Sequence, residues 1–191
     1  DLTDRLSFGA SLVLSQATMD GPFVGITGSS TDYAVRGTAG LDYELFPDTT
    51  VGIFWKSNAG YTFENLAGFV QGTYFDVSAD RPQSWGLGVA NKSLLNGRLL
   101  LACDAVYQQY TETAMFGQLF NDQWALQFGA QYALNDRVRL RLGYAWNENP
   151  MRDSVGVSVG GVPLPGAEDH VRYIEALFAA IPQDRITGGV S

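Results

Sequence analysis

The sequence predicts an all-β chain that crosses a membrane as the antiparallel strands of a β-barrel. Three observations support this fold class. Apolar and polar residues alternate over stretches of roughly 11 residues, the length that a tilted strand needs to cross a bilayer. The connections between these stretches are alternately short and long, as in transmembrane barrels. Charged residues make up 17% of the chain, below the roughly 25% of ordinary soluble proteins.

The clearest element is a hairpin over Gln123–Asn147. Its apolar face consists of Trp124, Leu126, Phe128, Ala130, Tyr132 and Leu134 in the first arm and Val138, Leu140, Leu142, Tyr144 and Trp146 in the second. Its polar face carries Gln123, Gln127, Gln131, Arg137, Arg139 and Arg141. Since successive side chains of a strand point to opposite faces, this pattern predicts two strands joined by a two-residue turn at Asn135-Asp136.

About eight strands are predicted in all, the last of them beginning at Asp184 and incomplete. The others are Leu6–Leu14, Asp32–Leu45, Thr50–Ser57, Ser84–Asn91, Arg98–Tyr110 and the two arms of the hairpin. Short connections are Phe46–Thr49, Lys92–Asn96 and Asn135-Asp136, and long ones are Gln16–Thr31, Asn58–Gln83, Thr111–Asp122 and Glu148–Asp184. Short and long connections alternate along the chain if Asn58–Gln83 is a single long connection. The alternation breaks if Phe63–Val77 is a full strand of the barrel.

The last long loop has a helical period. In Glu168–Ile181 the apolar residues Val171, Ile174, Leu177, Phe178 and Ile181 recur at intervals of three and four, which predicts a short amphipathic helix. A loop helix of this kind can pack over the rim of the barrel. Alternatively, it places Leu177 and Phe178 at the mouth, where they would help to admit an apolar ligand.

Composition and charge argue against several other classes of protein. The net charge of −8 argues against nucleic acid as a partner, because nucleic acid is bound by clustered Lys and Arg. The sequence contains no run of 18 apolar residues, so it does not predict a transmembrane helix. The chain does not open with the pattern of a signal peptide, so an exported protein would have this segment removed or outside the sequence given.

Nothing in the sequence predicts an enzyme, a metal site or a cofactor. Cys103 is the single cysteine, which excludes an internal disulfide, and it is interpreted as a small apolar side chain. His170 is the single histidine, and neither a serine nor a second metal ligand lies at a meaningful spacing from it. Phosphate-binding loops and paired catalytic carboxylates do not stand out either.

The inner faces of the predicted strands carry charges and a few apolar residues. The charges are Arg36, Asp42, Glu44, Asp104, Arg139 and Arg141, most simply lumen side chains that pair across strands. A sharper hypothesis is that Arg139 or Arg141 holds the carboxylate of a ligand, because a guanidinium group matches it. The inward apolar residues Val13, Phe54, Leu100 and Val106 would line a path for apolar solutes, or pack against a plug or a neighbouring strand.

Five stretches, taken together and in order, resemble the FadL/TodX family of outer-membrane transporters for long-chain fatty acids and hydrocarbons. Pro47–Ser57 is similar to its strand P-x-x-T-x-G-x-x-Y-[KR]-S, with Trp55 or Phe54 where Tyr is usual. The other stretches are Arg81–Ala90, Asp104–Tyr107, Leu140–Tyr144 with Asn149-Pro150, and Ile181–Gly189, where Arg185 stands in place of a more usual His.

The resemblance implies a 14-stranded barrel of the bacterial outer membrane, plugged by an N-terminal hatch and active as a monomer. It implies passive diffusion of hydrophobic compounds, either long-chain fatty acids or aromatic hydrocarbons, with outer-membrane lipids around the wall. Residues 1–191 would then be part of a single barrel domain, without the hatch and the terminal strands. Phe54, Leu100, Val106, Arg139, Arg141, Leu177 and Phe178 are the candidate ligand-binding residues.

Two alternatives from other classes stay open. The chain could form a small closed outer-membrane barrel with a structural or adhesion role, for which Glu148–Gln183 would be the contact loop. It could also be an outer-membrane lipase or protease that uses loop residues near His170, although the sequence does not show the nucleophile or acid partner that this requires. A closed ring of strands is expected for the small barrel, and an open edge for part of a larger one.

Overall fold

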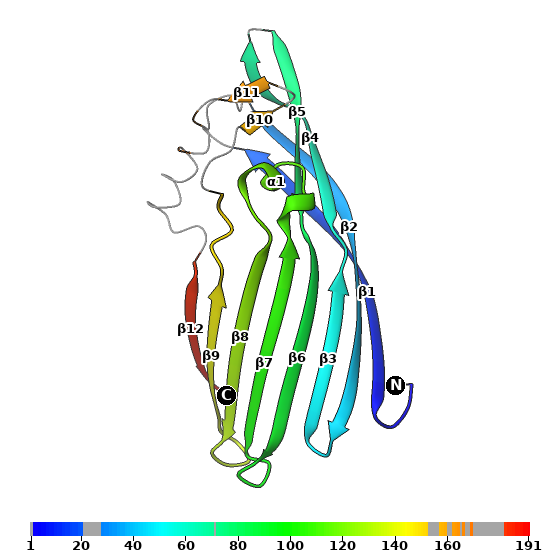
Figure 1. Ribbon diagram of the computed structural model, residues 1–191, viewed down its shortest axis with the longest axis vertical. Coiled ribbons are helices and arrows are strands. Elements are labelled where there is room, and N and C mark those ends of the chain that lie inside the picture. Colours follow the sequence, from blue (N-terminus) through cyan, green and yellow to red (C-terminus); the bar gives the residue numbers. More distant parts are fainter. Residues whose placement is uncertain are drawn as a thin grey trace.

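An open antiparallel sheet of eight strands is the main element of the chain (Figure 1). The structure is a computed structural model that describes residues 2–20, 28–70, 72–152, 157–159, 162–164, 166, 169 and 182–191. The sheet order is β1 (Leu6–Asp20), β2 (Ser29–Phe46), β3 (Thr49–Lys56), β6 (Gln83–Leu94), β7 (Leu99–Gln109), β8 (Gln123–Ala133), β9 (Arg139–Asn147) and β12 (Asp184–Val190). The predicted all-β antiparallel architecture is confirmed.

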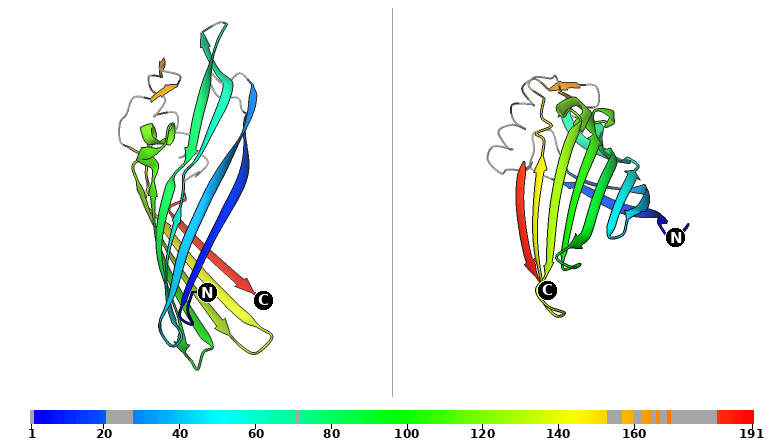
Figure 2. Two further views of the ribbon diagram at one scale, coloured as in Figure 1. Left: turned by 90° about the vertical axis from the view of Figure 1, so that its right-hand side faces the viewer. Right: turned by 60° about the horizontal axis from the view of Figure 1, so that its bottom comes forward.

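The two edges of this sheet, β1 and β12, do not pair with each other. Figure 2 shows the sheet as a curved wall with these two strands at its opposite ends. The described strands therefore form part of a barrel wall and not the closed ring that a small barrel requires.

The outer face of the wall is apolar and exposed, as expected for a surface in contact with lipid. Near the long-loop end, neighbouring strands place Trp55, Trp85, Tyr107 and Trp124 in one row. Tyr132 lies eight residues further along β8 than Trp124. With a rise of ~3.3 Å per residue and a tilt of ~40°, the eight-residue step from Trp124 to Tyr132 spans roughly 20 Å along the membrane normal. This distance is close to the height of the apolar band of outer-membrane barrels.

The loop of the β8–β9 hairpin is longer than predicted. Ala133 pairs with Arg139, and the backbone N–H of Leu134 donates to the carbonyl of Val138 at 3.0 Å. The loop proper is therefore 135–137. The Oδ1 atom of Asn135 accepts hydrogen bonds from the backbone N–H groups of Arg137 and Val138, both at 2.9 Å. The predicted two-residue turn is wrong, because this side chain closes a three-residue loop that includes Arg137 and removes it from the inner face.

The excursion between β3 and β6 forms a hairpin of its own. Its strands are β4 (Ala59–Val70) and β5 (Thr73–Arg81), which pair in a separate two-stranded sheet, while β3 pairs directly with β6. This hairpin projects beyond the wall at the long-loop end (Figure 1). The predicted single excursion is therefore confirmed, and the alternation of short and long connections holds along the described strands.

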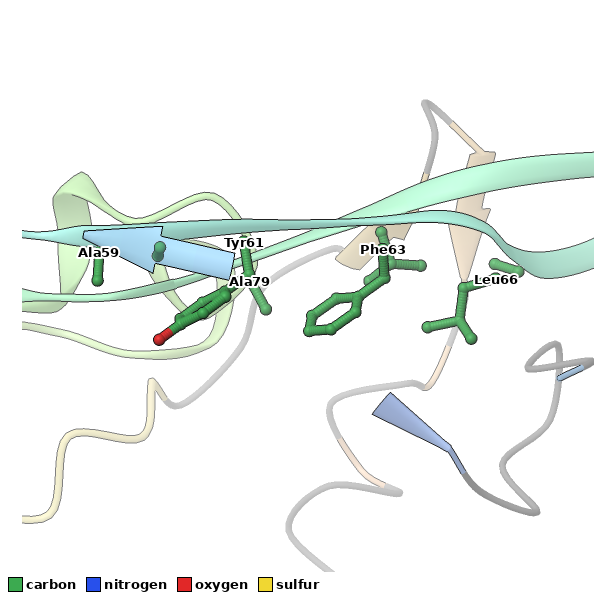
Figure 3. Packing of buried hydrophobic residues seen from close by; sticks show 8 residues of the cluster. Ala59, Tyr61, Phe63, Leu66 and Ala79 are labelled. Carbon is green, nitrogen blue, oxygen red and sulfur yellow. The ribbon is translucent and has the colours of Figure 1, made fainter. Parts of the chain in front are cut away.

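The largest buried cluster of the described residues belongs to this projecting hairpin (Figure 3). Phe63 is 2% exposed and Leu66 is 1% exposed. The hydroxyl groups of Tyr61 and Ser15 are hydrogen-bonded at 2.6 Å, which ties β4 to β1. The side chains of a single-layered barrel wall face either the lipid or the lumen. A packed core can therefore form only where a second layer lies against the wall.

The remaining elements are short and lie at the same end. Between β7 and β8 the chain forms a 3-10 turn, η1 (Tyr110–Glu112), and one helical turn, α1 (Phe116–Leu119). The last long loop contains a small ladder of β10 (Val157–Val159) and β11 (Val162–Leu164).

The helix predicted over Glu168–Ile181, with Leu177 and Phe178, lies outside the described residues apart from Asp169. No helix in the described part of the chain has the length and apolar content to span a membrane.

Candidate functional site

The inner face of the wall is ordered in rows, because β2, β3, β6 and β7 pair in continuous antiparallel register. Towards the long-loop end lies a polar row of Thr38, Lys56, Ser84 and Gln108. The next row consists of Gly40, Phe54, Gly86 and Val106. Below it follow Asp42, Gly52, Gly88 and Asp104. We call these the polar row, the apolar row and the acidic row.

In the apolar row, the ring of Phe54 covers Gly86 on the neighbouring strand. A Cβ atom on Gly86 would lie 2.1 Å from Cε1 and 2.3 Å from Cζ of Phe54, well inside van der Waals contact. An aromatic ring laid across a strand glycine fills the space that the missing side chain leaves. The structure thus brings together two of the predicted ligand-binding residues, Phe54 and Val106, on either side of Gly86.

Above the apolar row, three cations line a hollow of about 450 Å³. Arg36 comes from β2, Lys56 from β3 and Arg81 from the end of β5. The guanidinium of Arg36 donates to the backbone carbonyls of Ser57 at 2.8 Å and Pro82 at 2.9 Å. The ammonium of Lys56 lies 4.8 Å from the centre of the Phe54 ring, in cation–π geometry.

In the acidic row, each carboxylate lies against a glycine of the neighbouring strand. An Oδ1 atom of Asp42 lies 2.3 Å from the Cβ position of Gly52, and one of Asp104 lies 2.2 Å from that of Gly88. Both carboxylates line a hollow of about 340 Å³.

The cross-strand ion pairs predicted for the lumen are not seen between these charges in the described part of the chain. Arg36 instead bonds to backbone carbonyls. The apolar row holds the three cations and the acidic row apart.

The other predicted site residues lie near the short-turn end of the wall. Leu100 pairs with Gln131, and Gln131 pairs with Arg141. The Nε atom of Arg141 donates to the side-chain oxygen of Gln131 at 2.8 Å, while Arg139 lies one row further, beside Ala133. The predicted set therefore divides into two groups at different depths. A ligand carboxylate at Arg139 or Arg141 stays a prediction.

Sequence reasoning missed three residues of the upper hollow: Lys56, Arg81 and Tyr110. Lys56 has the same parity as Phe54 along its strand, so its inward position could have been predicted. Arg81 follows a segment without steady alternation, and its position is fixed by its pairing with Ala59 in the β4–β5 hairpin. Tyr110 begins the turn η1, and burial raises the pKa of its hydroxyl.

A carboxylate fixes the chain where it enters β8. Asp122 accepts hydrogen bonds from the Tyr107 hydroxyl at 2.5 Å and from the backbone N–H and hydroxyl of Thr111 at 2.9 and 2.7 Å. Partial burial opposes ionisation of Asp122, but these hydrogen bonds outweigh it and lower its pKa below the ordinary value. The loop 111–122 is thereby tied to the rim of the wall.

The single cysteine and the single histidine, which could act as a nucleophile or a metal ligand, lie away from the hollow or outside the described residues. Cys103 is half-buried on the outer face, in the same row as Phe128. The described residues contain no group of three or more His, Cys, Asp or Glu side chains arranged to hold a metal ion, and His170 lies outside them.

Most of the chain matches a known protein family. Residues 3–164 match the family described as "Putative outer membrane beta-barrel porin, MtrB/PioB". The chain belongs to the MtrB/PioB family. It is therefore part of a β-barrel of the bacterial outer membrane, as predicted.

Several solved structures share this fold. A FadL homologue of Pseudomonas aeruginosa has a TM-score of 0.59 at 14% identity, over 81% of this chain and 49% of that one. A TodX deletion mutant, titled a monoaromatic hydrocarbon channel, has a TM-score of 0.57 at 17% identity, over 98% and 57%. The P. putida toluene transporter TodX has a TM-score of 0.52 at 18% identity, over 76% and 51%.

These likenesses confirm the predicted FadL/TodX resemblance at the level of the fold. The chain spans about half the length of these channels. The comparison with curated proteins gives no match. The family is described as a porin and two of these structures are titled as a channel or a transporter, while the fold likeness alone does not identify a solute for this chain.

Proposed function

We propose that this MtrB/PioB-family chain forms part of the wall of a passive outer-membrane channel for hydrophobic compounds. The observation that carries the proposal is the apolar row, in which Phe54 and Val106 stand between the polar and the acidic rows of the inner face. A water-filled lumen gains nothing from exposing an aromatic ring. A hydrophobic solute that leaves water does gain, at ~25 cal/mol per Å² of apolar surface buried.

The solute class of the proposal is long-chain fatty acids or aromatic hydrocarbons. The fold likeness to channels titled for monoaromatic hydrocarbons supports this class. Leu100, near the short-turn end, would offer a second apolar contact after Phe54 and Val106. We also propose that residues 1–191 belong to one larger barrel domain that acts as a monomer and is closed by further strands and an N-terminal hatch.

A second candidate, passage of small polar solutes, is favoured by the composition of the inner face. Besides the apolar row, this face presents the polar and acidic rows and Gln127. Such a lining suits a water-filled pore. The two candidates predict opposite orders of uptake for polar and apolar solutes of similar size.

Liposomes that contain the full-length protein test the proposal. Entry of toluene and of oleate should be faster than into empty liposomes, and Phe54→Asp should slow it. Thr50→Asp is the matched control, because Thr50 lies on the same strand below the acidic row and receives the same charge. Equal entry with and without protein would overturn the proposal, and faster entry of arabinose alone would favour the polar candidate.

A further inference from the structure

The hollow above the apolar row holds three positive charges that no carboxylate neutralises in the described part of the chain. Arg36, Lys56 and Arg81 line it together with the hydroxyl-bearing Tyr110. Arg36 and Arg81 carry like charges on the same hollow. In a chain with a net charge of −8, a local excess of cations is opposite in sign to the chain as a whole.

The arrangement is fixed by specific contacts. The Nε and Nη2 atoms of Arg36 bond to the carbonyls of Ser57 and Pro82, and Nη2 also lies 3.5 Å from the Ser84 hydroxyl. These acceptors are uncharged, so they hold the guanidinium in place and leave its charge intact. The Phe54 ring does the same for the ammonium of Lys56.

The hollow has one acidic neighbour. Asp104 lines its lower side, and its carboxylate lies over Gly88 in the acidic row. The apolar row separates that carboxylate from the cations, and none of the three cations forms an ion pair with it among the described residues. The upper part of the hollow therefore presents positive charge together with unused N–H donors of Arg81 and Lys56.

We propose that this hollow is a binding site for small oxyanions at the long-loop end of the lumen. Guanidinium and ammonium donors recognise the oxygens of carboxylates and phosphates alike. The site would take such an anion from the outside medium, since long loops face outward in outer-membrane barrels. The inference does not depend on the proposed hydrophobic solute, because Phe54 serves here as the support of Lys56.

Nuclear magnetic resonance of the detergent-solubilised full-length protein tests binding directly. The ³¹P line of inorganic phosphate and the ¹³C line of labelled acetate should broaden in its presence. Lys56→Gln combined with Arg81→Gln should weaken binding at least about tenfold, because two of the three attracting charges are lost. Broadening of one line and not the other identifies phosphate or carboxylate as the ligand, and either result supports the site.

The matched control is Lys92→Gln combined with Arg137→Gln, which removes two positive charges at the short-turn end. This control should bind both anions as the wild-type protein does. In planar bilayers with a potassium chloride gradient, only the Lys56/Arg81 variant should shift the reversal potential towards cation selectivity. Absence of broadening by both anions, or equal loss in both variants, would overturn the proposal. Uptake of toluene is read separately, so failure of the hydrophobic channel leaves this result interpretable.

Discussion

Replacing Gly86 by alanine should displace the Phe54 ring from the inner wall. The new methyl group would lie 2.1 Å from Cε1 of the ring. Carbon atoms in contact lie at ~3.5–4.0 Å, so the ring has to move by roughly 1.5 Å. Overpacking of this kind costs about 1–3 kcal/mol in stability. The face of the ring also supports Lys56, so the displacement disturbs both the apolar row and the cationic hollow.

Urea unfolding of the full-length protein in lipid vesicles measures this cost. The test is a double-mutant cycle with Phe54→Ala, which removes the ring that the new methyl group meets. In that background, Gly86→Ala should be close to neutral, and the interaction free energy should be about 1–2 kcal/mol. The same cycle read by toluene entry should show that Gly86→Ala slows entry only when Phe54 is present.

Gly129 provides the control for the glycine itself. It lies on β8 in the same sheet, and a Cβ atom added there meets nothing within 4 Å. Gly129→Ala should therefore be neutral, or stabilising by ~0.4–1 kcal/mol through loss of freedom in the unfolded chain. The reasoning is refuted if Gly86→Ala costs the same with and without Phe54, or if Gly129→Ala costs as much as Gly86→Ala.

Three further outcomes are expected. Because the folded-state pKa of Asp122 is lowered, the stability it gives loop 111–122 is present above the unfolded Asp pKa of ~3.9 and is lost as pH falls through the lower folded value. Hydrogen exchange of the Thr111 amide should report this loss, and Asp122→Asn should abolish its pH dependence. Leu142→Arg, on the lipid face where Leu142 is 62% exposed, should cost about 2–4 kcal/mol in vesicle unfolding, whereas Gln131→Arg on the inner face should cost far less. Leu66→Ala should weaken the buried cluster of the β4–β5 hairpin by about 2–5 kcal/mol, seen as faster proteolysis of that hairpin with the wall intact.

The wall could be predicted from sequence because each strand has two faces with different solvents. Lipid and lumen impose alternation on every residue of β8 and β9, and this period is visible without any tertiary information. The β4–β5 hairpin lacks it for a physical reason. Its register shifts between Phe63 and Ala67, where Asn65 has a φ of 52°, and one of its faces is buried against β1, β2 and the loop that contains α1. Regular alternation is lost at such a bulge.

The candidate site was predictable in part. The parity of each strand places Phe54 and Val106 on the inner face, but parity does not say which residues share a row. That depends on the pairing of β3 with β6, which are separated in sequence by the whole excursion 58–82. The bonds of Arg36 to the carbonyls of Ser57 and Pro82 form at the two ends of the same excursion, so they could not be foreseen from local pattern.

The order of the three rows allows one wall to treat solutes differently. An uncharged hydrophobic solute interacts mainly with Phe54 and Val106, and the charges above and below these residues attract it little. At the proposed anion site, an oxyanion would be attracted by Lys56 and Arg81 and then repelled by Asp42 and Asp104 in the acidic row. The apolar row lies between Lys56 and the carboxylates of the acidic row, and no ion pair joins the cations to these carboxylates among the described residues. The two proposals, binding of anions at the mouth and passage of apolar solutes, therefore rest on different residues of the inner face and can be tested separately.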